Sequence, residues 1–473
     1  MLPDRVVERL GRLPPVSTSP SLPYPSAAMA LPFPEHPLRQ LVTQELHVRT
    51  FEPVHAPAVV VHFAYQCAER GSGANTAHLL RLLAHFGVGL PAADEVGQYF
   101  AADLGDTRVR WERHTEFVTY SFSRSVAPSA LAARPFSAEL LAELLAELPP
   151  DWLAALPGQV VTAVLLALES RDMPERTPAD LATLFGGNPV IGAGVTGGAG
   201  RAWSDLRIHA DGFGRILLRD QGLTDAQAGR LIKRVLDVNA YRAMTLLGLP
   251  AAREAAVALA DAESRLTDAA FRLGVAAPNG TAEAPPSERA LLAELTDVAA
   301  AIESVAARTA SRFDATAAYH EVVRQRLEQL RQERIEGLPT FTEFLEARLA
   351  PAVSTCLATG RRQQALAERA ARMTALLRAR VEVRLQEQNR SLLDSMDRRA
   401  RLQLRLQETV EGLSVVAISY YGVGLVGYLL KGLAAGGLPL DPSLAIAVAV
   451  PLVLGAVWLG LRRMRRRLRR GED

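Results

Sequence analysis

The sequence predicts an α+β cytosolic domain, a long helical, coiled-coil-like stalk and a C-terminal hairpin of two transmembrane helices. Three observations lead to this fold class. Residues 36–220 mix β-branched, alternating runs with helical spacing, which is typical of an α+β domain. Residues 221–411 are rich in Ala, Leu, Glu and Arg, which is typical of long helices. Residues 412–430 and 444–461 contain no charged side chain over lengths that match the hydrocarbon layer of a bilayer.

The composition agrees with a folded domain that carries a short membrane part. The chain has 473 residues, of which 49% are hydrophobic and 22% charged, and this length suggests two or three domains. The formal net charge is only +2, and we predict no nucleic-acid partner. The two cysteines, Cys67 and Cys356, lie far apart and form no CxxC pair, which indicates a reducing, cytosolic setting for the soluble part.

The first 35 residues are rich in Pro and Ser and contain no uninterrupted apolar run. A signal peptide would need such a run, so we predict a disordered leader over residues 1–35. Met29 is an alternative start of translation.

The pattern over residues 36–220 predicts both strands and helices. Strands are expected over residues 56–65, a β-branched run bounded by Pro57, and over residues 158–169, which read as a buried strand. Residues 107–123 alternate and form either a hairpin or one long strand. Residues 200–220 read as two strands around the turn sequence DGFG. A helix is expected over residues 75–88, with Asn at its start and Gly near its end.

Three long helical patterns make up the predicted stalk over residues 221–411. The first runs to Pro250 and continues beyond it, and a loop over residues 274–287 separates it from the second. The second covers residues 288–336, and the third covers residues 341–411. Pro351 lies inside the third pattern, where we expect the helix to be interrupted or bent.

Apolar residues of the third pattern follow two imperfect seven-residue registers. A polar Asn in such a seam can set the register and the number of helices in a coiled coil. The pattern fits a coiled coil and an irregular bundle equally well, and we predict a homo-oligomer. The members of the two registers are Leu385, Leu392 and Leu406, and Asn389, Met396 and Val410.

The predicted hairpin has four parts. These are a first transmembrane helix over residues 412–432, a short external loop over 433–443, a second transmembrane helix over 444–461 and a basic cytosolic tail over 462–473. Arg-rich segments flank both outer ends, so the positive-inside rule places both ends in the cytosol. We therefore predict a multi-pass protein of the bacterial inner (plasma) membrane, with the N-terminal domain and the C-terminal tail cytosolic and the lipid bilayer as a partner.

The first predicted transmembrane helix carries small and polar residues at helical spacing. Small residues let helices approach closely, and polar residues form hydrogen bonds between helices. This face either packs against a helix, from the second span or a second copy, or lines a pore in an oligomer. Its members are Ser419, Tyr420, Gly424, Gly427, Tyr428 and Lys431.

Histidines are concentrated in the N-terminal half, since seven of the nine lie between His36 and His114. None has the HExxH or HxxxH spacing of a metal site, so we predict no metal. The sequence WERHTEF places Glu112, His114 and Glu116 on one face of a predicted strand. These three and His47 are the candidate catalytic residues, although three polar side chains on one strand face are also typical of a solvated surface.

The sequence GAGVTG over residues 192–197 matches the GxGxxG pattern of dinucleotide sites. That motif needs a preceding strand, a following helix and an acidic residue further on. Here an alternating, strand-like run follows instead. We predict a Gly-rich turn, and the sequence offers no signature from which a cofactor could be named.

Several stretches resemble an uncharacterised family of bacterial proteins with predicted membrane anchors, known as a domain of unknown function. The resemblance covers nearly all of the chain after residue 35, and it implies a membrane anchor and no activity. The stretches are HPLRQLVTQELHVRTF (36–51), RWERHTEFVTY (110–120), GRLIKRVLDVNAYRAMTLLGLP (229–250) and LQETVEGLSVVAISYYGVGLVGY (406–428).

The predicted plan also resembles that of CorA-like magnesium channels. These have a cytosolic α/β domain, a long helix that enters the membrane, two C-terminal spans and a basic tail. Their Gly-Met-Asn signature is absent, because the corresponding position reads LLKGLAAGG. Lys431 near this mouth would repel cations.

Three functions from different classes fit these patterns. The first, which we favour, is a membrane-anchored cytosolic scaffold or regulatory protein. The second is an oligomeric ion channel or transporter with a CorA-like plan. The third is an enzyme that uses the His/Glu cluster of the N-terminal domain, and no motif supports the last two.

Overall fold

A computed structural model describes residues 36, 38–39, 42, 51–67, 73–89, 96–275, 288–435 and 442–468. The chain divides into two compact units. The sheet unit comprises Met1–Thr281 and Ala293–Arg372, and the hairpin unit comprises Ala282–Leu292 and Met373–Asp473. The predicted leader, His47 and most of the predicted external loop lie outside the described residues.

The described part of the sheet unit contains one mixed, nine-stranded sheet with the strand order β2-β3-β4-β1-β5-β8-β7-β6-β9. Neighbouring strands are antiparallel except for β5 and β8, which are parallel. The strands are β1 (Ala58–Cys67), β2 (Tyr99–Leu104), β3 (Thr107–Arg113), β4 (Phe117–Ser125), β5 (Gly158–Glu169), β6 (Ile191–Val195), β7 (Gly200–Ile208), β8 (Gly214–Asp220) and β9 (Glu333–Arg334).

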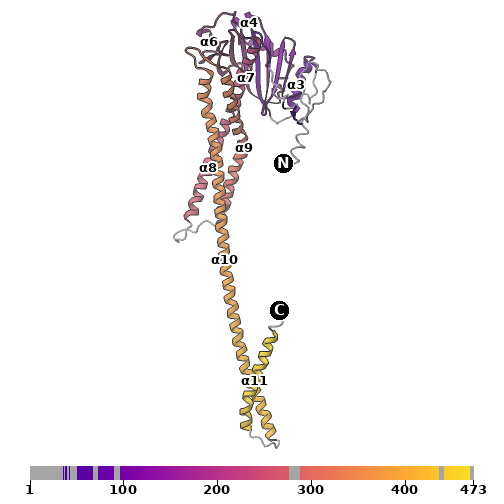
Figure 1. The fold of residues 1–473 in the computed structure, drawn as a ribbon, viewed down its shortest axis with the longest axis vertical. Coiled ribbons are helices and arrows are strands. Elements are labelled where there is room, and N and C mark those ends of the chain that lie inside the picture. Colours follow the sequence, from indigo (N-terminus) through magenta and orange to yellow (C-terminus); the bar gives the residue numbers. More distant parts are fainter. Residues whose placement is uncertain are drawn as a thin grey trace. The chain divides into compact units, whose positions relative to one another are not determined.

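Both faces of the sheet are covered by helices, so the central strands read as continuous apolar runs rather than alternating ones. The face that carries Val59 and Val61 packs against α3 (Gly73–His85), α4 (Pro128–Ala133), α5 (Ala138–Ala146) and α6 (Pro178–Leu184). The face that carries Val60 and Ala64 packs against α7 (Asp225–Leu246) and against parts of α9 (Glu288–Gln329) and α10 (Phe341–Ala435). Figure 1 shows the sheet with α7 beside it.

Side-chain hydrogen bonds cap the N-termini of several of these helices. Thr224 accepts a hydrogen bond from the backbone of Gln227, and Gln227 accepts one from the backbone of Thr224, which forms a capping box at the start of α7. Thr177 and Asp180 make the same reciprocal pair at α6. Ser137 caps α5 through its hydroxyl.

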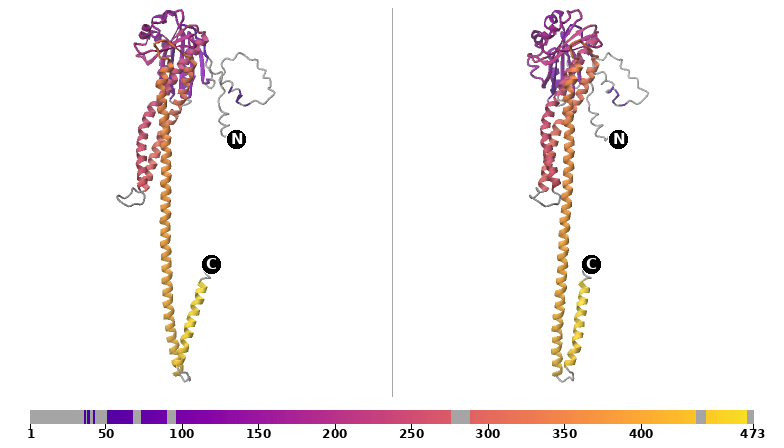
Figure 2. Two further views of the ribbon diagram at one scale, coloured as in Figure 1. Left: turned by 60° about the vertical axis from the view of Figure 1, so that its left-hand side comes forward. Right: turned by 90° about the vertical axis from the view of Figure 1, so that its left-hand side faces the viewer.

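Beyond α7 the sheet unit continues as a bundle of three helices. α8 (Gly248–Val275), α9 (Glu288–Gln329) and the first part of α10 (Phe341–Ala435) run alongside one another (Figures 1 and 2). Small and aromatic side chains fill the space between them, including Ala255, Phe313 and Cys356. Cys356 is therefore a buried apolar group in this bundle.

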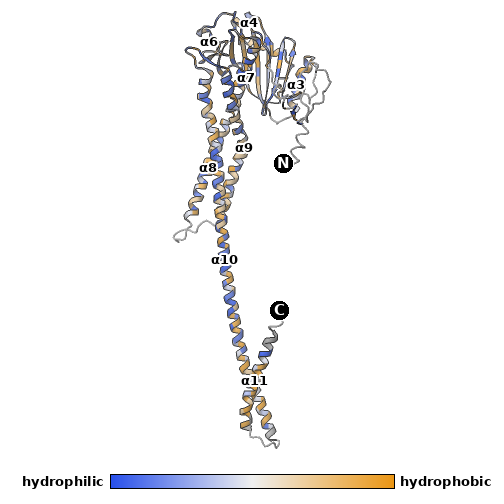
Figure 3. Cartoon of the chain, in the orientation of Figure 1, coloured by the Kyte–Doolittle hydropathy of each residue, from blue (hydrophilic) through white to orange (hydrophobic). Residues whose placement is uncertain are grey.

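The described part of the hairpin unit contains most of α10 and all of α11 (Pro442–Leu468). The two helices approach closely at glycines, since a Cβ atom at Gly422 would lie 3.0 Å from Val453 Cγ1. Apolar residues dominate both helices where they pair (Figure 3). Most of these apolar side chains are exposed, among them Leu425, Leu429 and Leu452.

Two described helices are long and apolar enough to cross a membrane, by length and composition alone. They cover Asp225–Gly274 and Phe341–Gly432, and a shorter apolar stretch covers Ile446–Gly460. The first includes α7, whose apolar side chains Leu231 and Val235 pack against the sheet. The second contains the first span predicted from the sequence.

The structure confirms most of the predicted elements and adds five that were not predicted. The predicted strands at residues 56–65, 158–169 and 200–220 correspond to β1, β5 and the pair β7–β8. Residues 107–123 form a hairpin, β3–β4. GAGVTG forms β6 and the turn to β7, with no helix after it. The sequence analysis missed β2, the short helices α4 to α6 and β9.

One helix limit predicted from the sequence is wrong, and of the two alternatives expected at Pro351, an interruption or a bend, the interruption is excluded. The second stalk helix ends at Gln329, because Arg331 adopts a left-handed backbone conformation with φ 48° that terminates α9. The chain then forms β9 at the sheet edge. α10 is not interrupted at Pro351, which lies within its continuous run. Pro351 is the eleventh residue of α10, so it removes one intrahelical hydrogen bond, and the helix continues through it.

Candidate functional site

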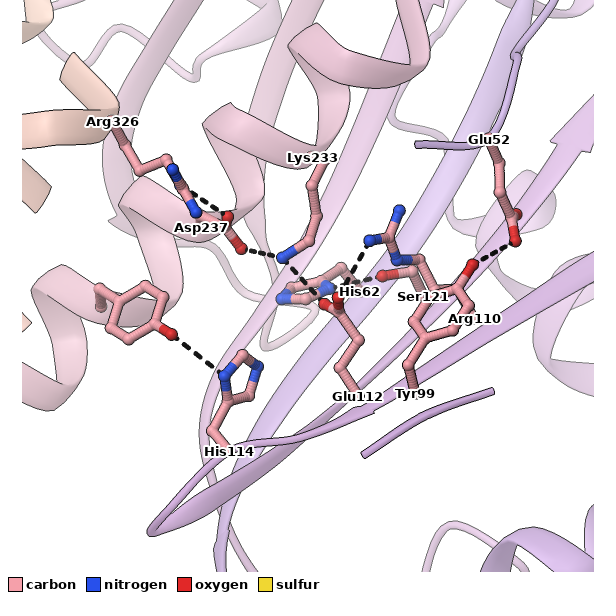
Figure 4. A network of polar contacts seen from close by, with 11 residues as sticks. Glu52, His62, Tyr99, Arg110, Glu112, His114, Ser121, Lys233, Asp237 and Arg326 are labelled. Atoms are coloured by element: carbon pink, nitrogen blue, oxygen red, sulfur yellow. Dashed lines mark hydrogen bonds and ion pairs between the residues drawn. The ribbon is translucent and has the colours of Figure 1, made fainter. Parts of the chain in front are cut away.

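Five charged side chains form a buried ladder between the sheet and two helices, and we call them the charge chain. They are Arg110 and Glu112 on β3, Lys233 and Asp237 on α7, and Arg326 on α9 (Figure 4). Arg110 Nη2 lies 2.9 Å from Glu112 Oε1, and Lys233 Nζ lies 2.8 Å from Glu112 Oε2. Lys233 also contacts Asp237, whose Oδ2 lies 3.0 Å from Arg326 Nε.

The periodicities of strand and helix bring these side chains together. Arg110 and Glu112 are two residues apart on β3, so both point to the face that α7 covers, whereas Trp111 points to the other face. Lys233 and Asp237 are four residues apart and therefore share one face of α7.

Burial decides the energetics of the charge chain. The side chains of Lys233, Glu112 and Asp237 are only 13%, 7% and 8% exposed. Burial alone would raise the pKa of Glu112, but the positive charges of Lys233 and Arg110 outweigh it and hold this pKa well below its usual value. Glu112 is therefore an ionised acceptor at neutral pH rather than a proton donor.

His62 lies on β1 beside the charge chain (Figure 4). Its Nδ1 is 2.9 Å from the hydroxyl of Ser121, its partner across the β1–β4 ladder. Among the described residues, its Nε2 has no hydrogen-bond partner. Burial and then the charge of Lys233 lower the pKa of His62 to about 3, so the ring is neutral at neutral pH.

His114 and Glu116 lie in the turn between β3 and β4, not on the strand. The prediction that they share one strand face with Glu112 is therefore wrong, because the chain reverses after Arg113. His114 Nδ1 lies 3.0 Å from the hydroxyl of Tyr241, and its ring stacks on Phe117. Glu116 lies 2.7 Å from Arg312 and accepts a hydrogen bond from Tyr319.

A cavity of about 310 Å³ lies at this turn. The structure thus separates the candidate residues, because Glu112 enters the charge chain whereas His114 lines the cavity. Its lining residues are Gln98, Arg113, His114, Thr115, Tyr241 and Tyr319.

A second polar contact extends the charge chain toward the sheet edge. Glu52, which precedes β1, accepts a hydrogen bond of 2.7 Å from the Tyr99 hydroxyl and another of 2.7 Å from Arg108 Nε. Arg110 lies over the Tyr99 ring at 5.1 Å. A Cβ atom at position 229 would lie 1.7 Å from the carbonyl oxygen of Glu52, so only glycine lets this segment cross α7 there.

The charge chain is suited to joining elements rather than to chemistry. Each of its two carboxylates is paired with two cations, so both are engaged within the chain. His114 and Tyr241 can exchange a proton, but no described serine or cysteine lies with them in the cavity lining. Within the described ranges, no group of three His, Cys, Asp or Glu is arranged to hold a metal ion.

The sequence analysis missed Arg110, Lys233, Asp237 and Tyr241 as members of the site. The sequence does contain one indication that Lys233 belongs to the site, because it is one of only two lysines in a chain whose other basic side chains are arginines and histidines. Lys233 and Asp237 also stand four residues apart inside an apolar helical pattern, which predicts a buried ion pair. Their partner Glu112 is far away in the sequence, and only the sheet topology brings it under α7.

The residues predicted as one face of the first transmembrane helix occupy two faces of α10. Ser419 is buried, and a Cβ atom at Gly427 would lie 3.7 Å from Ile446 of α11. The other four members are exposed and lie away from α11: Tyr420, Gly424, Tyr428 and Lys431.

The fold and site define a protein with an N-terminal mixed-sheet domain, a long helical region and two helices apolar enough to cross a membrane. The chain belongs to the family described as "Protein of unknown function (DUF3422)", whose model matches residues 34–468. This match confirms the resemblance to an uncharacterised family. No curated protein and no solved structure gives a significant match. The likeness to CorA-like channels is not shown by these comparisons.

Proposed function

We propose that this protein is a membrane-anchored scaffold or regulatory protein. In this proposal α10 and α11 form a transmembrane hairpin, and α10 carries the sheet unit as a cytosolic domain. The observation that carries the proposal is the exposed apolar surface of the hairpin unit. Leu425, Leu429 and Leu452 are each at least 65% exposed. So large an apolar surface is costly in water and stable in lipid.

Burial distinguishes this segment from the other apolar helix. In the most apolar window of Phe341–Gly432 only 11% is buried, against 33% for Asp225–Gly274. The helix over Asp225–Gly274 contains α7, whose apolar side face already packs on the sheet. The segment Asp225–Gly274 is therefore explained as core helices of a folded domain, whereas the apolar part of Phe341–Gly432 is explained as a lipid-facing helix.

The ends of the hairpin support an orientation with both outer ends in the cytosol of a bacterial cell. Arginines cluster after residue 461 and between residues 398 and 405. The Arg462 guanidinium lies 4.9 Å from the ring of Trp458, which is 56% exposed. An exposed Trp beside an Arg is typical of the membrane–water boundary, where the amphipathic ring and the charge are both stable.

The charge chain favours a scaffold or regulatory role over catalysis. It connects β3, α7 and α9 through paired charges. Such a connection transmits displacement between elements, because no member can move without unpairing a buried partner.

Reporter fusions test the orientation. A cytosolic reporter fused after Asp473 should be active, and an exported reporter inserted after Gly437 should be active as well. A chain truncated after Arg380 serves as the control and should leave the membrane fraction. Recovery of the full-length protein in the soluble fraction without detergent would contradict the proposal that the hairpin anchors the protein in a membrane.

A second candidate function, an oligomeric channel or transporter, is favoured by one observation. Tyr420, Gly424, Tyr428 and Lys431 recur at helical spacing on the face of α10 that α11 leaves exposed. In a homo-oligomer this face would meet another copy or line a pore.

The exposed seam of α10 supports assembly in either case, since Leu385, Leu392 and Leu406 are all more than half exposed. Liposomes with the purified protein discriminate the two functions. Ion flux that Lys431→Glu alters selects the channel, and absence of flux from an intact oligomer selects the scaffold.

A further inference from the structure

An arginine-lined pocket lies on the sheet unit, next to the Arg326 end of the charge chain and apart from the His114 cavity. Its volume is about 310 Å³. It is formed by the first two turns of α7, the end of α9 and the turn between β6 and β7. The lining residues are Thr196, Gln227, Arg230, Arg234, Gln329 and Arg331.

No carboxylate is among the described residues that line this pocket. Among the described residues, none of Arg230, Arg234 and Arg331 makes an ion pair. Their hydrogen bonds go to neutral carbonyl groups instead. Arg234 Nη1 donates to the Gln329 carbonyl at 3.1 Å, and Arg331 Nη2 donates to the Thr196 carbonyl at 3.3 Å.

Burial makes this arrangement costly. Arg234 Nε is buried, and within the described part of the chain it has no hydrogen-bond partner. Burial lowers the pKa of Arg234, and the charges of Arg230, Arg326 and Arg331 lower it further. Arginines are usually paired when they lose water. Arg230 and Arg234 are partly buried and Arg331 is exposed, and an anion that enters between them would compensate their charges.

Backbone hydrogen bonds join two of the segments that form the pocket. Arg331 has a left-handed φ of 48°, and its carbonyl accepts a hydrogen bond from Gly197 at 3.5 Å, while Thr196 N donates to the Leu330 carbonyl at 2.8 Å. The end of α9 is thereby fixed against the β6–β7 turn. Glu333, the acidic residue near this turn, lies over Gly194 and Gly198 and does not line the pocket.

We propose that this pocket binds the phosphate groups of a small phosphorylated ligand. Guanidinium groups pair with phosphate oxygens through parallel hydrogen bonds, and three of them match a multiply charged anion. The Gln227 oxygen is used in the capping box at Thr224, which leaves its amide NH₂ to donate. The described lining contains no aromatic side chain that could stack on a nucleobase. The ligand is therefore recognised by its phosphates, either as a free metabolite or as a lipid headgroup.

The pocket adjoins the charge chain along both helices. Arg234 follows Lys233 on α7, and Arg326 of the charge chain lies on the same end of α9 as Gln329. The proposal does not depend on the membrane anchor, since all of its residues lie in the sheet unit.

Calorimetric titration of the full-length protein in detergent tests the proposal. The probes are sodium pyrophosphate and the soluble short-chain lipid dihexanoyl phosphatidic acid. We expect at least one to bind and Arg230→Gln to weaken that binding by about tenfold or more, because one charged pair is lost. Arg253→Gln, which removes an exposed arginine of α8, should bind as the wild type does.

The stronger probe identifies the source of the phosphate, because pyrophosphate stands for a free metabolite and phosphatidic acid for a lipid. Arg230 makes no hydrogen bond to another described residue, so Arg230→Gln should fold, and its melting temperature without ligand should equal or exceed that of the wild type. Absence of binding of both probes to the wild type overturns the proposal. Equal binding by Arg230→Gln and the wild type overturns it too.

Discussion

Lys233 lies between two buried carboxylates, and its removal would leave like charges facing each other. Glu112 and Asp237 would keep only Arg110 and Arg326 as partners. Loss of one partner from a buried ion pair costs about 3–5 kcal/mol, because the remaining charge loses its compensation. A substitution of Lys233 therefore weakens the contacts between β3, α7 and α9 together.

We predict that Lys233→Met lowers the stability of the full-length protein by about 3 kcal/mol, near the lower end of that range because each carboxylate keeps one arginine. The melting temperature followed by circular dichroism in detergent measures this. The matched control is Arg324→Met, which removes a cation from an exposed pair on α9. It should melt close to the wild type. Equal melting temperatures for the two variants would show that the charge chain is not stabilising.

His62 gives the sheet unit a dependence on pH with a definite sign. Its folded-state pKa of about 3 lies below the unfolded value, which is about 6.5. The unfolded chain therefore binds the additional proton between these values. Stability from the neutral ring is complete above pH 6.5 and falls as the pH drops, by about 1.4 kcal/mol per pH unit.

We predict that His62→Gln flattens this dependence. Between pH 7.5 and pH 5 the wild type should lose about 2 kcal/mol more than the variant. Melting temperatures across this range give the comparison. His85→Gln, at an exposed position on α3, should keep the wild-type profile. Parallel profiles for the wild type and His62→Gln would mean that His62 does not stay neutral in the folded state.

At the scale of elements, glycines set the approach of α10 and α11. A Cβ atom at Gly422 would lie 3.0 Å from Val453, whereas one at Gly424 would meet nothing within 4 Å. The two positions are thus a matched pair on one helix. Small residues permit close contact between helices, and a larger side chain at the contact forces them apart.

We predict that Gly422→Val separates α10 from α11 and that Gly424→Val does not. Cysteines introduced at Gly427 and Ile446, which lie in contact, report the pairing by disulfide formation. Cross-linking should fall strongly in Gly422→Val and stay unchanged in Gly424→Val. Equal cross-linking would contradict the packing of this hairpin. A smaller oligomer in Gly424→Val alone would indicate that the exposed face of α10 joins copies.

An element can be predicted from the sequence when its own hydrophobic pattern is long enough to define it. β5 was predicted with its limits because residues 158–169 form one apolar run between Pro157 and the polar residues after Glu169. The short helices α4 to α6 were missed, because segments of 6 to 9 residues carry too few repeats to show a period. β9 was missed because two charged residues, Glu333 and Arg334, form it only by pairing with β6.

The candidate site shows the same limit. The pair Lys233 and Asp237 lies within one helical repeat and could be recognised from the sequence. Glu112 joins it from a distant strand, and the tertiary fold alone places it there. His114 was assigned to a strand because the alternation continues through residues that form the turn.

At the scale of the whole molecule, α10 is a single helix of 95 residues from Phe341 to Ala435. It begins in the sheet unit and ends in the hairpin unit. Each unit has packing of its own, with the sheet core in the first and the contacts of α10 with α11 in the second. Continuity of the backbone hydrogen bonds between them is therefore a separate property, which a local break can test.

We predict that Glu408→Pro breaks α10 without unfolding either unit. Proline removes one backbone hydrogen bond and clashes with the preceding turn, at about 3 kcal/mol or more. Glu408 is exposed and pairs with no described side chain, so Glu408→Ala is a matched control that keeps the helix. Limited proteolysis should cut the proline variant near residue 408 and spare the alanine variant. The melting temperature and the cross-link between positions 427 and 446 should stay at wild-type values in both. Resistance of Glu408→Pro to protease at the wild-type level would contradict this prediction, because it would show that α10 accommodates the proline as it does Pro351.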